Sequence, residues 1–292
     1  MSSQYLKTPI EDLLKGIDEE KILETLRLSH PNTPPKLWAE ALELIFLALS
    51  TWLPRDVQEF ESIEIEKSYK NGKIFIDLIG VNRGTLKPFS DHRGAKTLVD
   101  WKTTFQPVDG EKFKNKCVSS WQWKTYGAVV KDARLFSYRG ISRTTFDPLT
   151  SGEQRPRVRE VLINIPPDID KAVEIQYNGV HRQLEALKLL PIWPMNTESC
   201  WDFGVPCPEL EACKNYSLHD QVIEVGGELS YSSMMTFLRC PERYRMKEVR
   251  KQGFLEDDLE STDSTLVGTL VHEGLAEYYK AVWKSKGDLK NG

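Results

Sequence analysis

The sequence lacks an uninterrupted apolar run of about 18 residues, so it predicts no membrane span. Its start, MSSQYLKTPIEDLL, is polar and soon acidic, which does not resemble a secretory signal. Internal repeats and low-complexity segments are absent as well. The 292 residues are 40% apolar and 28% charged, a composition typical of one large globular domain or two small ones. We therefore expect a globular, cytoplasmic protein.

An excess of positive charge is also missing. The formal net charge is −4, which argues against a wholly basic nucleic-acid binder but leaves room for local basic patches. One such patch is RCPERYRMKEVRK, residues 239–251, with four Arg and two Lys against two Glu. The sequence therefore allows contact with nucleic acid at one defined segment.

Cysteine is scarce and unevenly placed. Cys117 stands apart, whereas Cys200, Cys207, Cys213 and Cys240 lie within 41 residues. We expect no disulfides in a cytosolic chain, where clustered thiols are typical of a metal site. Four thiolates can bind zinc or an iron–sulfur cluster. The absence of a Cys-x-x-Cys knuckle weakens the zinc interpretation, and buried free thiols are the third alternative.

Hydrophobic periodicity and turn residues predict helices, then a mostly-β block with interleaved helices, then helices. The predicted helices cover residues 8–29, 36–53, 111–131, 168–190, about 230–250 and 264–285. The predicted strands are ESIEIEKSYK and KIFIDLIGV around an Asn71-Gly72 turn, then AKTLVDWKT, ARLFSYRG and REVLINI. We predict an α/β core with helices on its faces.

The hairpin places carboxylates on one side of the sheet. A two-residue turn at 71–72 pairs Glu66 with Asp77 and Glu64 with Ile79. Cross-strand partners share a face, so Asp77 lies on the side of the two glutamates. Asp77 is also bracketed by apolar residues, and burying its carboxylate requires a partner or a cation. The alternative is a strand end with Asp77 in solvent.

The segment LVDWKTT, residues 98–104, repeats this pattern. Asp100 and Lys102 share a face because side chains alternate along a strand. Such a pair can hold Mg²⁺ or Mn²⁺ through the carboxylate, while the lysine orients water and offsets charge on a phosphate. An Asp-x-Lys pair alone is also typical of a surface ion pair.

FIDLIG followed by LVDWKTT resembles the PD-(D/E)XK nuclease superfamily, and especially its RecB-type and CRISPR-associated exonucleases. In that branch the first acid lies in a strand after a hairpin, and the second motif reads Asp-aromatic-Lys-Thr. The Pro that names the superfamily is missing here. QWKTY adds Gln122 and Tyr126 on one helix face, where the branch has Gln-x-x-x-Tyr facing the active site and DNA. A half-buried core face is the alternative for this helix.

The same branch often carries a 4Fe-4S cluster. Three of its cysteines follow the nuclease core, and one lies in a Cys-Pro segment of a helix. The resemblance assigns these places to Cys200, Cys207, Cys213 and Cys240. Such a cluster would tie a loop to a helix and stabilise the domain.

GTLVHEGLAEYY, residues 268–279, resembles the branch's Gly-x-x-x-His helix, whose imidazole is a metal ligand. A structural role for His272 is the alternative. In the branch this helix and the Cys-Pro helix precede the core, whereas here they follow it. Either the chain is circularly permuted, or residues 228–292 begin a second, truncated copy. Residues 1–58 contain no cysteine and only His30, in a predicted turn, which favours permutation.

The resemblance implies a restriction-endonuclease-like core, a mixed central sheet flanked by helices, with additional helical cover. We predict an N-terminal helical segment at 1–55, the nuclease core at 56–195 and a cysteine-rich loop at 196–227. The C-terminal helices at 228–292 would complete the same domain.

The implied activity is that of a metal-dependent DNA nuclease, most typically an exonuclease. Asp77, Asp100, His272 and the Trp101 carbonyl would hold Mg²⁺ or Mn²⁺, and Lys102 would position the water for in-line attack. The expected supporting residues are Glu64 or Glu66 as a further carboxylate near the ions, Gln122 and Tyr126 at the substrate or the lysine, and Arg239, Arg243 and Arg245 at phosphates.

The implied partners are single-stranded or duplex DNA ends, together with proteins of recombination, repair or CRISPR adaptation. Phage recombination also uses such domains. The first alternative is a non-catalytic DNA-end-binding or recombination-assembly protein of the same fold, against which the intact Asp77, Asp100 and Lys102 argue. The second alternative is a zinc-stapled interaction domain.

Overall fold

The computed structural model describes residues 10–69, 74–144, 157–188, 190, 193, 196, 201–202, 205–207, 231–245 and 263–287. Two compact units divide the chain: residues 1–167 with 261–292, and residues 168–260. We call them unit 1 and unit 2. This division differs from the predicted boundaries, because the long helix after residue 168 lies in unit 2 and residues 228–292 fall into both units.

Unit 1 contains a five-stranded mixed sheet in the order β1-β2-β3-β4-β5. Its strands are β1 (Phe60–Tyr69), β2 (Ile74–Asn82), β3 (Lys96–Thr104), β4 (Ala133–Ser142) and β5 (Val158–Asn164). β3 and β4 run parallel, whereas the other neighbours are antiparallel. The predicted mixed sheet of an α/β fold is therefore confirmed.

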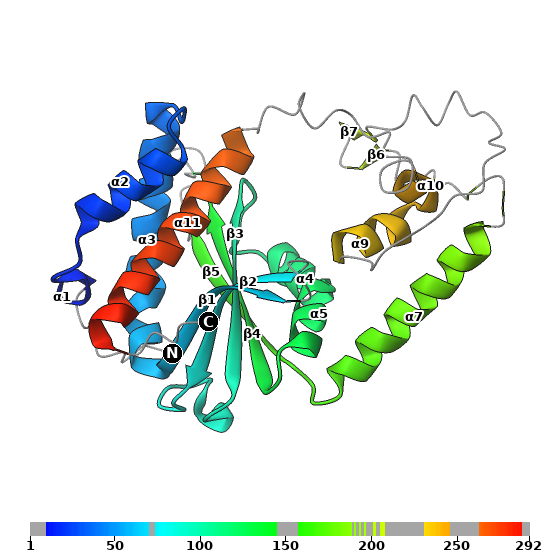
Figure 1. Ribbon diagram of the computed structural model, residues 1–292, viewed down its shortest axis with the longest axis horizontal. Helices are drawn as coiled ribbons and strands as arrows, with labels where there is room; N and C mark the ends of the chain where they lie inside the picture. Colours follow the sequence, from blue (N-terminus) through cyan, green and yellow to red (C-terminus); the bar gives the residue numbers. More distant parts are fainter. Residues whose placement is uncertain are drawn as a thin grey trace. The chain divides into compact units, whose positions relative to one another are not determined.

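Helices cover both faces of this sheet (Figure 1). The described helices of unit 1 are α1 (Ile10–Leu14), α2 (Glu19–Ser29), α3 (Pro35–Glu59), the 3-10 turn η1 (Ser90–His92), α4 (Glu111–Ser119), α5 (Gln122–Val129) and α11 (Asp263–Lys286). α3 and α11 pack side by side on one face, and α4 and α5 lie on the other. The last helix of the chain thus belongs to the same unit as the sheet.

Alternation along the strands explains these two layers. Leu78, Val99 and Trp101 point into the main apolar cluster with α3 and α11. Gly140 on β4 faces the other way, and a Cβ there would collide with the ring of Phe113 on α4. A glycine at this position lets α4 approach the strand closely.

The hairpin register is the one that the Asn-Gly turn predicts. Glu64 pairs with Ile79, and Lys67 pairs with Ile76. The turn itself, residues 70–73, lies outside the described residues. Glu66 would stand opposite Asp77, but it adopts φ 51°, a left-handed conformation unusual for a residue with a side chain. The ladder is therefore irregular beside Asp77.

Two predicted helices are each broken in two. Residues 111–131 form α4 and α5, because Ser120 is extended and ends α4, and its hydroxyl accepts a hydrogen bond from the N–H of Gln122, the first residue of α5. Residues 230–250 contain α9 (Tyr231–Arg239) and α10 (Pro241–Tyr244). The second break falls at Cys240, because Pro241 favours the first position of a new helix.

Unit 2 also contains α7 (Ile169–Lys188) and the short strands β6 (Trp201–Asp202) and β7 (Val205–Pro206). It has a buried cluster of its own, in which the rings of Trp193 and Tyr244 stack 6.4 Å apart. The cluster comprises Val180, Leu184, Trp193, Met234, Phe237 and Tyr244. α7 and α9 therefore pack through an apolar interface within unit 2.

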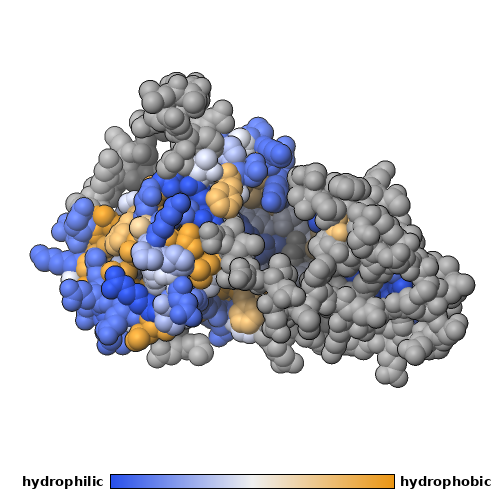
Figure 2. Space-filling view, turned by 90° about the horizontal axis from the view of Figure 1, so that it is seen from above, coloured by the Kyte–Doolittle hydropathy of each residue, from blue (hydrophilic) through white to orange (hydrophobic). Residues whose placement is uncertain are grey.

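Among the described residues, one helix, α3, is long and apolar enough by composition to cross a membrane. Its apolar side chains, including Leu44, Leu49 and Leu53, lie in the main cluster of unit 1. The buried central helix of a folded unit passes the same test. On the face drawn in Figure 2, the described side chains are mainly hydrophilic, with small apolar groups among them.

Candidate active site

The two predicted aspartates meet where the ladder between β2 and β3 ends. The last described pair on that side is Leu78 with Val99, so the next positions in register are Asp77 and Asp100. The Trp101 N–H donates a hydrogen bond to Asp77 Oδ2 at 2.7 Å, so this carboxylate replaces a backbone acceptor on β2. The sheet therefore presents two carboxylates opposite one another on neighbouring strands.

Lys102 and α5 both engage Asp100. The Lys102 ammonium lies 2.9 Å from Oδ2 and 3.1 Å from Oδ1 of Asp100. Gln122 Nε2 donates to Asp100 Oδ1 at 2.7 Å and to the Tyr126 hydroxyl at 3.0 Å. Asp100 is buried, whereas the Lys102 side chain is 42% exposed. The structure thus brings the Asp-x-Lys pair and the Gln-x-x-x-Tyr helix together.

His272 reaches this site from the far end of the chain. Its Nδ1 lies 3.5 Å from Asp77 Oδ2, and its ring packs edge-on against Trp101 with centroids 6.2 Å apart. Gly268, one turn earlier on α11, lies so close to β3 that a Cβ would stand 2.9 Å from the Thr103 hydroxyl. The Gly-x-x-x-His spacing therefore has a physical basis, because the glycine lets α11 approach the strand that carries Asp100.

The electrostatics of the site are dominated by burial and by an excess of carboxylate. Burial raises the pKa of Asp100 to about 6, with Lys102 opposing the shift and Asp77 adding to it. Burial lowers the pKa of Lys102, but Asp100 and Asp77 outweigh it, so the net shift is upward. The pKa of His272 is likewise raised, because Asp77 and Asp100 outweigh the burial that lowers it. The shifts of Lys102 and His272 indicate a site that attracts positive charge, whereas the shift of Asp100 comes mainly from its burial.

No three His, Cys, Asp or Glu side chains in the described part of the chain already surround one point as metal ligands. Asp77 and Asp100 are instead held by protein donors. Even so, Asp100 Oδ2 is buried and receives no well-aligned hydrogen bond. Two carboxylates and an imidazole are also a donor set suited to Mg²⁺ or Mn²⁺. These residues therefore fit a divalent ion by their chemistry.

The two glutamates of β1 are engaged elsewhere. Glu64 pairs with Lys67 at 3.4 Å, and Glu66 pairs with Lys280 of α11 at 2.9 Å. Both carboxylates are thus held by lysines at the surface.

The predicted DNA-contacting arginines divide into two kinds. Arg239 and Arg243 line a groove of about 550 Å³ in unit 2, together with Met235, Thr236 and Leu238. Arg245 differs from the prediction, because it is only 1% exposed and its guanidinium forms a buried ion pair with Glu242. Arg245 therefore cannot offer its charge to a phosphate at the surface.

Two of the four clustered cysteines, Cys200 and Cys213, lie outside the described residues. Cys207 is partly exposed after β7, and Cys240 is buried at the start of α10. Cys117 lies on α4 of unit 1, where burial and then Asp100 raise the pKa of its thiol to about 11. The cysteine cluster therefore stays a prediction.

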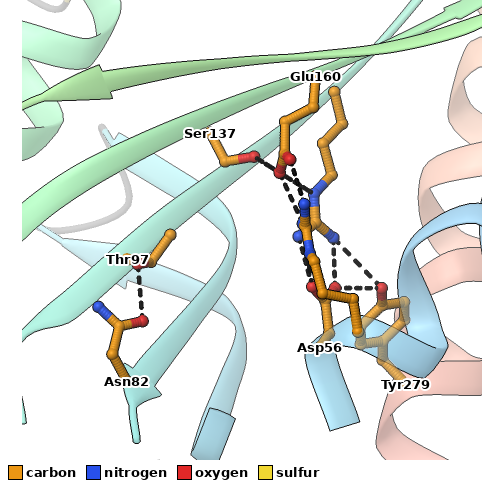
Figure 3. Close-up of polar contacts among 8 residues, drawn as sticks. Asp56, Asn82, Thr97, Ser137, Glu160 and Tyr279 are labelled. Atoms are coloured by element: carbon orange, nitrogen blue, oxygen red, sulfur yellow. Dashed lines mark hydrogen bonds and ion pairs between the residues drawn. The ribbon is translucent and has the colours of Figure 1, made fainter. Parts of the chain in front are cut away.

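A second set of buried charges lies on the opposite face of the sheet, and the sequence reasoning missed it. Arg139 of β4 donates to Asp56 of α3, with Nη2 and Oδ1 2.7 Å apart. Glu160 of β5 accepts from Ser137 and from Arg55, the latter at 2.7 Å from Nη2 (Figure 3). The available signal was an arginine inside the apolar strand ARLFSYRG, the same signal that marked Asp77.

The mixed five-stranded sheet, its two helical layers and the strand-end carboxylates define an α/β domain of restriction-endonuclease-like architecture. The family model of the PD-(D/E)XK nuclease superfamily matches residues 228–291, which include α9, α10 and the His272 helix α11. This match supports the superfamily resemblance that the motifs indicate. No curated protein and no solved structure gives a significant match.

Proposed function

We propose that the chain is a metal-dependent DNA nuclease that hydrolyses phosphodiester bonds. The observation that carries this proposal is the convergence of Asp77, Asp100 and His272 beside Lys102, from β2, β3 and α11. The three ligands, with the Trp101 carbonyl, would hold Mg²⁺ or Mn²⁺. Such an ion supplies Lewis-acid activation of the phosphate and of water.

The side chains around the ligands have separate tasks. Lys102 keeps its proton, because its pKa is raised by the two aspartates, and its partly exposed ammonium would hold the attacking water and offset charge on the phosphate. Gln122 fixes one oxygen of Asp100 by a 2.7 Å hydrogen bond. Tyr126 holds Gln122 in turn, so the α5 face supports Asp100 from behind.

The finer part of the proposal is exonuclease action on DNA ends, in the manner of the RecB-type branch and with a circularly permuted motif order. Its support is the motif resemblance and the docking of α11 into the unit that contains the sheet. Arg239 and Arg243 would contact backbone phosphates in the unit 2 groove. A cytoplasmic place in recombination, repair or CRISPR adaptation would suit such an activity.

The test is digestion of end-labelled linear DNA, single-stranded and duplex, and of closed circular DNA, with Mn²⁺ or Mg²⁺. We expect linear DNA to be degraded, circular DNA to be spared and chelation to stop the reaction. Lys102→Ala should be slower by roughly 10²–10³-fold, the usual cost of removing a group that stabilises transition-state charge. Lys114→Ala, which removes a surface ion pair with Glu111 on α4, is the matched control.

Equal inactivity of the wild type and Lys102→Ala would remove the nuclease proposal. DNA-end binding without cleavage would then favour the assembly-protein alternative. Cleavage of circular DNA would support the nuclease proposal and contradict exonuclease action.

We also propose a structural 4Fe-4S cluster on Cys200, Cys207, Cys213 and Cys240. Its support is the spacing of the cysteines and the burial of Cys240 at a helix break. Protein purified without oxygen should be brown and contain iron and sulfide, and Cys240→Ser should lose both, whereas Cys117→Ser should keep them. A colourless protein with stoichiometric zinc would instead favour the zinc-stapled alternative.

A further inference from the structure

The position of α11 decides whether His272 faces Asp77. Unit 2 separates α11 from the strands in sequence, so the helix must dock onto unit 1 as a distinct segment. Its apolar side chains, such as Val267, Val271 and Leu275, pack into the main cluster. Apolar burial stabilises this docking, but it is not directional. A directional contact is needed to fix how far along its axis the helix lies.

Tyr279 supplies that contact. It follows His272 by seven residues, close to two helical turns, so both side chains lie on the same side of α11. The Tyr279 hydroxyl donates to Asp56 Oδ2 at 2.6 Å, and Arg139 Nη1 lies 3.3 Å from the same hydroxyl. All three side chains are almost fully buried. These hydrogen bonds therefore attach α11 to both α3 and β4.

Trp101 connects the Tyr279–Asp56 contact to the candidate active site, where Asp77 and Asp100 lie. Its fully buried ring lies 5.6 Å from the Tyr279 ring and 6.2 Å from the His272 ring, measured between centroids. Its backbone N–H holds Asp77. The indole is thus in contact with two residues of α11, while the backbone of the same residue sits between Asp100 and Lys102.

We propose that Tyr279 is a positioning residue, which fixes α11 through Asp56 and the Trp101 ring and thereby sets His272 against Asp77. For its consequence on metal binding, this inference rests on the proposed nuclease function. The geometric claim can be tested without a metal.

Tyr278 provides a matched control on the neighbouring position. Its hydroxyl is buried and has no hydrogen-bond partner among the described residues, and its ring packs against Phe46 at 5.7 Å. Tyr278→Phe and Tyr279→Phe therefore remove the same atom from two buried tyrosines of one helix. Only Tyr279→Phe breaks a hydrogen bond to Asp56, which belongs to the second set of buried charges.

The first measurement uses the full chain without added divalent ions, with ¹⁵N-labelled histidine at one fixed pH. The His272 ring resonances, assigned with His272→Asn, should move in Tyr279→Phe and coincide with wild type in Tyr278→Phe. Unmoved resonances in Tyr279→Phe would overturn the proposal. Should that variant not fold, Asp56→Asn weakens the same hydrogen bond from the α3 side without changing α11 or the Trp101 ring, and it should also move the His272 signals.

The second measurement is the Mn²⁺ affinity of the same proteins by calorimetry, with their thermal unfolding. Tyr279→Phe should bind Mn²⁺ roughly tenfold more weakly, the lower end of the usual loss when a residue that orients a metal ligand is changed. Tyr278→Phe should bind like wild type. A lowered unfolding temperature with unchanged affinity would show a purely structural Tyr279 and overturn the proposal. Absence of Mn²⁺ binding by wild type would refute the proposed metal site, and the NMR comparison would still decide the positioning claim.

Discussion

Two buried sets of charges flank the central strands, and they are balanced in opposite ways. The ion-pair cluster, comprising Asp56, Arg55, Arg139 and Glu160, has two acids against two guanidiniums. The carboxylate site has Asp77 and Asp100 against Lys102, with His272 at its edge. Burial raises the pKa of Glu160 and of Asp100 alike. Arg55 and Arg139 nevertheless bring Glu160 down to about 2, whereas Asp100 stands at about 6.

This contrast distinguishes a set of charges that stabilises the fold from a site whose excess negative charge is suited to bind a cation. Each carboxylate of the cluster meets a guanidinium with hydrogen-bond geometry, so the cluster needs no further cation. In the carboxylate site a single ammonium serves Asp100, and Asp77 relies on a backbone N–H and an imidazole. A divalent cation would supply the missing positive charge.

The largest expected effect comes from breaking the ion-pair cluster. Arg139→Met should lower the free energy of unfolding by about 3–5 kcal/mol, because it removes the guanidinium that contacts both oxygens of the buried Asp56 carboxylate and leaves, of the two guanidiniums, only Arg55 at a longer 3.2 Å. Urea unfolding of the full chain measures this. The control is Arg157→Met, which removes a pair with the half-exposed Glu43 and should cost less than about 1 kcal/mol. Equal losses in the two variants would show that burial does not distinguish these pairs.

The next effect is a pH dependence of opposite sign in the two regions. Without added divalent ions, folded Asp100 keeps its proton up to about pH 6, whereas the unfolded residue loses it near 3.8. The folded chain binds more protons between these values, so this contribution to stability is lost as pH rises through about 6. Asp100→Asn should therefore stabilise the protein by about 2–3 kcal/mol at pH 7, and the gain should vanish near pH 4.

The contribution of Glu160 to stability should change with pH in the opposite direction. Its pKa is lowered from 4.5 to about 2, so its contribution is present above 4.5 and is lost as pH falls towards 2. Glu160→Gln should then cost about 3 kcal/mol at pH 7, with the difference from wild type shrinking in acid. The unfolding midpoints of Asp100→Asn and Glu160→Gln, measured across this pH range, test the two expectations. Parallel pH curves for Asp100→Asn and Glu160→Gln would contradict the contrast.

The same contrast explains what the sequence could and could not predict. Strand periodicity and the Asn-Gly turn predicted the hairpin register, because local geometry determines it, and Glu64 indeed pairs with Ile79. Asp77 could be marked as a charge in an apolar strand. The pairing of Asp56 with Arg139 joins residues 83 positions apart, and no spacing rule indicates such a partner. The break at Ser120 was missed because apolar periodicity continues across it, while the extended backbone of one residue separates the two helices.

The smallest expected effects come from removing one orienting hydrogen bond on each side. Gln122→Ala deletes the 2.7 Å bond to Asp100, and Ser137→Ala deletes the hydroxyl that donates to Glu160. We expect Gln122→Ala to slow Mn²⁺-dependent cleavage roughly tenfold, with little change in unfolding, because Asp100 keeps its lysine but loses its fixed orientation. Ser137→Ala should lower the free energy of unfolding by about 1.5 kcal/mol, the lower end for a hydrogen bond to a charged group because Glu160 keeps Arg55, and leave cleavage unchanged. If cleavage and stability fell together in both variants, the two regions would be one coupled network, and the separation of a stabilising cluster from a binding site would not hold.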